Sequence, residues 1–61
     1  MKINQQRKEK GFEGLNDVRN LMELINDHVA DNEFDEAVYL LRKVREMLIE
    51  AEVNFKFVHL A

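Results

Sequence analysis

The 61-residue chain contains no cysteine, serine, threonine or tryptophan. Without cysteine it can form neither disulfides nor thiolate metal sites. Tyr39 is then the only side chain with a hydroxyl or thiol group to serve as a nucleophile. The two glycines do not form a phosphate-binding loop. These absences argue against a stand-alone enzyme, and we expect neither catalytic residues nor a cofactor.

Long apolar runs are also missing, so we expect no membrane-spanning segment. A helix that lies on a membrane surface needs a polar face rich in lysine and arginine, whereas the first predicted helix is acidic, so we expect no membrane association. The first ten residues are charged, but no apolar block follows them, which argues against a secretory signal. An apolar content of 46% with 34% charged residues is typical of a helical domain rather than a disordered segment. We therefore expect a cytoplasmic protein that folds.

A metal site is not expected either. Asp31, Glu33 and Asp35 have the spacing that opens a calcium-binding loop. The sixth position of such a loop must be glycine, and here it is Glu36; the twelfth is Arg42 instead of glutamate. Capping of the following helix explains these residues better: Asp31 and Asn32 are both suited to its N-cap, and Asp35 stands three residues after Asn32, as in a capping box.

Apolar residues follow a heptad pattern over two segments. In each segment they are spaced alternately by three and four residues, as on a helix that buries one seam against other helices. The first stripe is Leu15, Val18, Met22, Ile25 and Val29, and the second is Phe34, Ala37, Leu41, Val44, Leu48, Ala51, Phe55 and Val58. The pattern predicts helices over about 15–30 and about 33–58, joined by a short turn as an all-α antiparallel hairpin within residues 14–61.

The segment before the first stripe is polar and basic. Residues 1–10 carry a net charge of +3, residues 11–36 carry −7, and residues 37–61 carry +1. Gly11 and Gly14 each lower the local helix propensity by roughly 1 kcal/mol relative to alanine. We expect residues 1–13 to be a flexible basic arm, either solvated or ordered only on a partner.

The second predicted helix is longer than the first by about 13 Å, at 1.5 Å per residue. Its overhang carries Phe55, Phe57 and Val58, and Leu40 and Met47 add a second apolar row. Unless the N-terminal arm folds back, one hairpin cannot cover this surface, so we expect a homodimeric four-helix bundle. The residues predicted to mediate self-association are Leu15, Val18, Met22, Ile25, Leu41, Val44, Leu48, Phe55 and Val58.

Residues 32–40 resemble the UVR hairpin, a module of bacterial excision-repair subunits and of some protease adaptors. Phe34 matches its buried phenylalanine, Ala37 its first alanine and Leu40 its leucine, whereas Leu41 and Arg42 stand where arginine and aspartate are usual. The resemblance implies docking between hairpins of different proteins. In length and hairpin plan alone, the chain also looks like the Rop-type plasmid copy-number regulators, which are dimeric four-helix bundles that bind RNA.

Together these features predict a small protein–protein interaction module, acting as regulator, adaptor or inhibitor of a larger protein. Bacteria and their phages often encode such chains. Apolar residues outside the heptad seam are the candidates for contact with that partner: Leu24, Tyr39, Ile49, Val53 and Phe57. The alternative is a Rop-like dimer that binds RNA or DNA through Arg42, Lys43 and Arg45.

Overall fold

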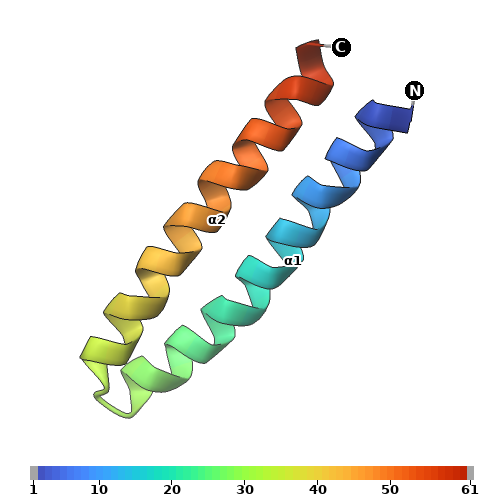
Figure 1. Ribbon diagram of the computed structural model, residues 1–61. Coiled ribbons are helices and arrows are strands. Elements are labelled where there is room, and N and C mark those ends of the chain that lie inside the picture. Colours follow the sequence, from blue (N-terminus) through green and yellow to red (C-terminus); the bar gives the residue numbers. More distant parts are fainter. Residues whose placement is uncertain (1, 61) are drawn as a thin grey trace.

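Two long antiparallel helices joined by a tight turn make up the structure (Figure 1). The computed structural model describes residues 2–60 and, for side chains, residues 5–58. Helix α1 spans Lys2–Ala30 and helix α2 spans Phe34–Leu60. The start of α1 and the end of α2 lie together at one end of the hairpin, with the turn at the other (Figure 1). The prediction of an all-α antiparallel hairpin is confirmed.

The N-terminal segment differs from the expected arm, because α1 begins at Lys2 instead of near residue 15. Straight-chain residues that favour helix fill this segment, and the amide of Gln5 donates to the carboxylate of Glu9 one turn later at 3.2 Å. Helix α2 supplies a neighbouring surface along its length. Met1 and Ala61, the outermost residues of the two predicted ranges, lie outside the described residues.

The two glycines allow α1 to pack closely against α2. Gly11 is buried, and a Cβ atom built on it would lie 2.6 Å from the tip of the Phe55 ring. At Gly14 the equivalent atom would be 3.8 Å from the Cβ of Ala51. The helices have 29 and 27 residues, so the predicted overhang of α2 is absent. The N-terminal segment does not fold back as a separate arm; it continues α1, which therefore runs alongside α2 over the length predicted to overhang.

The turn between the helices is a helix C-cap. Asn32 has a φ of 62°, the left-handed conformation that commonly ends helices. Its N–H donates to the carbonyl of Val29 at 3.0 Å, and the N–H of Glu33 donates to the carbonyl of His28 at 2.8 Å. These two bonds define a Schellman motif, so Asn32 closes α1 rather than capping α2. The N-cap position of α2 is Glu33, whose carbonyl accepts from Ala37 at 3.1 Å.

The core between the helices is thin. Ile25, Ala37 and Val44 form its buried cluster, and three half-buried side chains pack against it: Val18, Leu21 and Leu40. The hairpin exposes 5164 Å². A compact monomer of 7.3 kDa is expected to expose about 4,200 Å². The excess, roughly 1,000 Å², resembles the area that one partner contributes to a standard protein interface.

Candidate interaction surface

The seam between the helices uses heptad positions d and g, where Leu15 and Phe34 are counted as position a. Position d supplies the buried Ile25, Ala37, Val44 and Ala51. Position g supplies half-buried side chains on both helices: Leu21, His28, Leu40 and Met47. The predicted seam consisted of positions a and d. In the structure, position g therefore takes the place in the seam that the prediction gave to position a.

Position a is left uncovered on both helices between Leu15 and Leu48, whereas Phe55, the next residue at position a, is half-buried with its ring against Gly11. The six large apolar residues at position a from Leu15 to Leu48 are between 39% and 56% exposed. We call this set the open face; it consists of Leu15, Met22 and Val29 from α1 and Phe34, Leu41 and Leu48 from α2. Single exposed apolar residues are common on protein surfaces, but a regular row on each of two helices is unusual for a surface that faces only water.

The two rows of the open face lie on the same side of the hairpin. Successive heptad positions are separated by about 100° around a helix, which places position a roughly 90° from the middle of the d and g rows. In an antiparallel pair, that rotation turns the a rows of both helices toward the same side. Phe12 and Val38, both at position e and exposed, extend this surface outward.

Part of the open face forms a shallow hollow on α2. Val38 and Leu41 line it together with Arg42 and Arg45. Val38 and Leu41 supply the apolar part, and the two arginines supply long stems and charged ends. Such side chains often border apolar contact areas between helices, because their stems pack while their charges stay in water.

The structure divides the residues predicted to mediate self-association into two groups. Val18, Ile25, Val44, Phe55 and Val58 lie within the hairpin, buried or half-buried. The others remain available to a second chain: Leu15, Met22, Leu41 and Leu48. The predicted set omitted Val29, Phe34, Phe12 and Val38. Val29 and Phe34 belong to the same heptad stripes, so the spacing alone could have identified them.

Phe34 differs from what the UVR resemblance implies. In that module the matching phenylalanine is buried, whereas Phe34 is 56% exposed in this hairpin. It lies in the first turn of α2, beside the connection between the helices. A second chain on the open face would be needed to bury it.

The residues predicted to contact a partner protein are all exposed: Leu24, Tyr39, Ile49, Val53 and Phe57. They occupy positions b, c and f, away from the open face, and we call them the outer surface. Two of them have basic neighbours. The guanidinium of Arg7 lies 4.5 Å from the centre of the Phe57 ring, and the ammonium of Lys43 lies 5.6 Å from that of Tyr39. Both distances suit cation–π contacts.

The basic residues predicted to bind nucleic acid do not form one cluster. Arg42 and Arg45 line the hollow beside the open face. Lys43 extends over Tyr39 instead. On an α-helix, Lys43 at position c points roughly 160° away from Arg45 at position e. Lys43 therefore points away from the hollow that Arg42 and Arg45 line.

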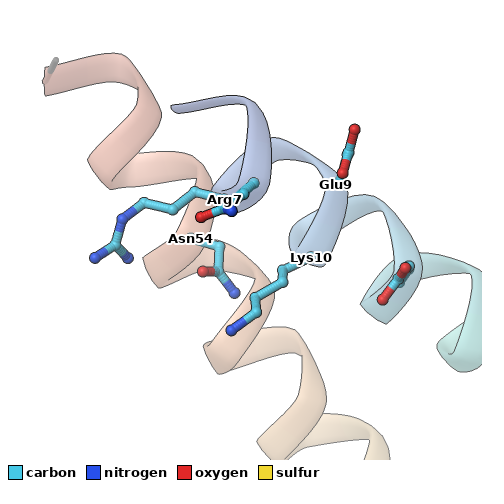
Figure 2. A pocket seen from close by; sticks show the side chains of 6 residues that line it. Arg7, Glu9, Lys10 and Asn54 are labelled. Atoms are coloured by element: carbon cyan, nitrogen blue, oxygen red, sulfur yellow. The ribbon is translucent and has the colours of Figure 1, made fainter. Parts of the chain in front are cut away.

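A polar depression of about 520 Å³ lies near the start of α1 (Figure 2). Its lining consists of Gln6, Arg7, Glu9, Lys10, Glu13 and Asn54. In Figure 2 the side chains of Arg7 and Lys10 extend toward the helix that carries Asn54, whereas Glu9 points away from it. The amide of Asn54 donates to the carbonyl of Glu50 at 3.1 Å. Ligand pockets are mostly apolar and enclosed, and this open, mixed-charge depression lacks both properties.

Among the side chains of residues 5–58, no three or more histidines, cysteines, aspartates or glutamates group as metal ligands would. Neither described helix has a stretch that is long and apolar enough to cross a membrane. The open face is thus the most distinctive feature among the described side chains. Comparison with protein-family models, curated proteins and solved structures found no match to this chain.

Proposed function

We propose that this protein is a small, non-enzymatic interaction module that pairs through its open face as a homodimeric four-helix bundle. In the cytoplasm it acts as regulator, adaptor or inhibitor of a larger protein, which it contacts through the outer surface. The observation that carries the proposal is the uncovered row of large apolar residues on both helices. Positions a, d and g together make the broad apolar surface that helices of a four-helix bundle share.

The energetics support pairing. Full burial of a leucine, methionine, valine or phenylalanine side chain contributes about 1.5–3 kcal/mol, so covering a half-exposed one contributes about 1 kcal/mol. The six open-face residues therefore supply roughly 6 kcal/mol per chain, or roughly 12 kcal/mol per dimer, before association costs. Those costs are on the order of 4–15 kcal/mol. The balance permits a dimer at micromolar concentration without requiring one of extreme affinity.

The test compares two aspartate substitutions on α2. Leu41→Asp places a charge on the open face. Ile49→Asp places the same charge on the outer surface, at a residue that is 57% exposed compared with 46% for Leu41. Sedimentation equilibrium over a wide concentration range, with circular dichroism on the same samples, should show a dimer for the parent chain and for Ile49→Asp. Leu41→Asp should be monomeric. A parent chain that stays monomeric at the highest concentration contradicts the proposal.

The second candidate is a dimer that binds structured RNA or duplex DNA. It is favoured by Arg42 and Arg45, which line one hollow and would occur twice in a dimer. Binding through phosphate contacts should weaken steeply as salt is added. If the dimer binds neither nucleic acid at low salt, this function is excluded and the protein-binding role stands.

A further inference from the structure

Charge is separated along the long axis of the hairpin. The turn end, residues 27–36, carries five acids and no lysine or arginine, a net charge of −5: Asp27, Asp31, Glu33, Asp35 and Glu36. We call it the acidic tip. At the opposite end, residues 2–10 of α1 carry four basic residues and one acid, a net charge of +3. The adjacent residues 52–60 of α2 carry Glu52 and Lys56, which cancel. The hairpin extends 46 Å along this axis.

Two symmetric arrangements cover the open face with a second copy. In one, both turns lie at the same end, and α1 of each copy packs across α2 of the other. In the other, the turns lie at opposite ends, so α1 packs across α1 and α2 across α2. Neighbouring helices are antiparallel in both, which means that helix dipoles do not distinguish the two arrangements.

The charges do distinguish them. With the turns at the same end, two acidic tips of −5 lie side by side and repel each other. With the turns at opposite ends, each acidic tip lies beside the +3 segment of the other copy. Complementary charge across an interface fixes which orientation is adopted, and like charge in juxtaposition disfavours the alternative.

We infer that the second copy docks with its turn at the opposite end, so that each acidic tip lies against the basic start of α1 in the other copy. This inference rests on the self-association proposed above. The apolar rows are compatible with it: because Leu48 lies near the middle of α2, it meets the Leu48 of the second copy, and Leu41 meets Phe55. Along α1, Lys8 comes beside Met22, where its stem can cover the thioether while its charge remains in water.

Distance measurement between labelled turns tests the orientation directly. The chain has no cysteine, so Ala30→Cys gives a single labelling site at the exposed end of α1. With two nitroxide labels per dimer, pulsed electron resonance should give a distance of roughly 40 Å for turns at opposite ends, from the rise of 1.5 Å per residue. Turns at the same end should give roughly 20 Å, from helix spacings of 8–10 Å. The shorter distance overturns the inference and leaves the dimer intact, whereas labels that show no pairing contradict the proposed function itself.

A charge reversal at the acidic tip supplies an independent test. Asp27→Lys with Asp31→Lys changes the tip from −5 to −1. Basic residues suit the last turn of α1, so the hairpin should not lose helicity. We expect the dimer dissociation constant to rise about tenfold, because the attraction to the basic segment is lost. A dissociation constant that falls would indicate relieved repulsion between tips and would refute the inference.

The matched control makes the same change of net charge near mid-length. Asp17 and Glu46 are exposed and lie close to the centres of α1 and α2. Asp17→Lys with Glu46→Lys should change the dissociation constant much less than the tip reversal. Equal effects of the two pairs would mean that net charge matters and its placement does not, which would also refute the inference. Added salt should weaken the parent dimer, since it screens attraction over about 10 Å at 0.1 M.

Discussion

Alanine at Gly11 and at Gly14 should have opposite effects on stability, although the two glycines lie one turn apart on α1. Replacing glycine by alanine within a helix contributes about 1 kcal/mol. At Gly14 the added methyl group would lie at an ordinary contact distance of 3.8 Å from the Cβ of Ala51. We therefore expect Gly14→Ala to raise the free energy of unfolding by nearly that full amount.

At Gly11 the same methyl group would meet three atoms of the Phe55 ring at 2.6, 2.7 and 3.0 Å. The ring has to move away from α1, and overpacking of this kind typically costs about 1–3 kcal/mol. After the gain in helix propensity, Gly11→Ala should lower the free energy of unfolding by about 0–2 kcal/mol. The two variants should thus differ by about 1–3 kcal/mol.

Urea unfolding followed by circular dichroism, at one fixed chain concentration, measures this difference. Phe55→Leu provides the control background, because leucine lacks the ring atoms that crowd Gly11. In that background Gly11→Ala should be stabilising, and the double-mutant cycle should report the coupling between residues 11 and 55. If both alanine variants stabilise the parent chain equally, the close packing of Phe55 on Gly11 is refuted.

Two further predictions concern the turn and the seam. Asn32→Gly should raise the free energy of unfolding by up to about 1 kcal/mol, since glycine adopts the left-handed conformation without a Cβ penalty, and Asn32→Ala should lower it. Thermal unfolding measures both changes. An alanine variant that is more stable than the parent chain would contradict the Schellman turn. Val44→Asp should abolish helicity, because it buries an unpaired carboxylate at a cost of several kcal/mol. Leu48→Asp, at an exposed position, should lose the dimer but keep more helicity than Val44→Asp at the same chain concentration. Circular dichroism distinguishes these two variants, and a folded Val44→Asp chain would refute the seam.

The heptad spacing predicted two helices and their antiparallel pairing, but it did not identify which rows would meet. On both helices, positions a, d and g are all apolar over most of their length, so seams of a with d and of d with g are equally regular. Which of these rows meet in the seam depends on the size of their side chains. Small residues at Gly11, Gly14, Ala37 and Ala51 occupy d and g, and they let the helices approach closely. The large residues at position a suit a contact in which the helices lie farther apart.

The start of α1 was mispredicted for a related reason. Intrinsic propensity disfavours helix at Gly11 and Gly14, and the a/d register places polar residues before them. In the d/g register the same glycines are contact positions, one covered by Phe55 and the other by Ala51. Tertiary packing therefore outweighs a local preference of about 1 kcal/mol per glycine. The small residues at positions d and g, had they been counted as contact positions, would have indicated that α1 extends through Gly11 and Gly14.

The distribution of apolar volume between the seam and the open face links folding to association. Two of the buried seam residues, Ala37 and Ala51, are alanines, and the larger side chains of Phe34, Leu41 and Leu48 lie on the open face. Much of the apolar area available for burial thus lies on the open face. If two copies pair there, as proposed, the unfolding midpoint should rise with chain concentration. For a dimer that unfolds in one step, a tenfold increase in concentration adds about 1.4 kcal/mol per dimer. With an unfolding entropy of about 2.1 cal/mol/K per residue, the midpoint should rise by about 5 °C. A midpoint that does not depend on concentration would mean that the thin d/g seam alone holds the helices together.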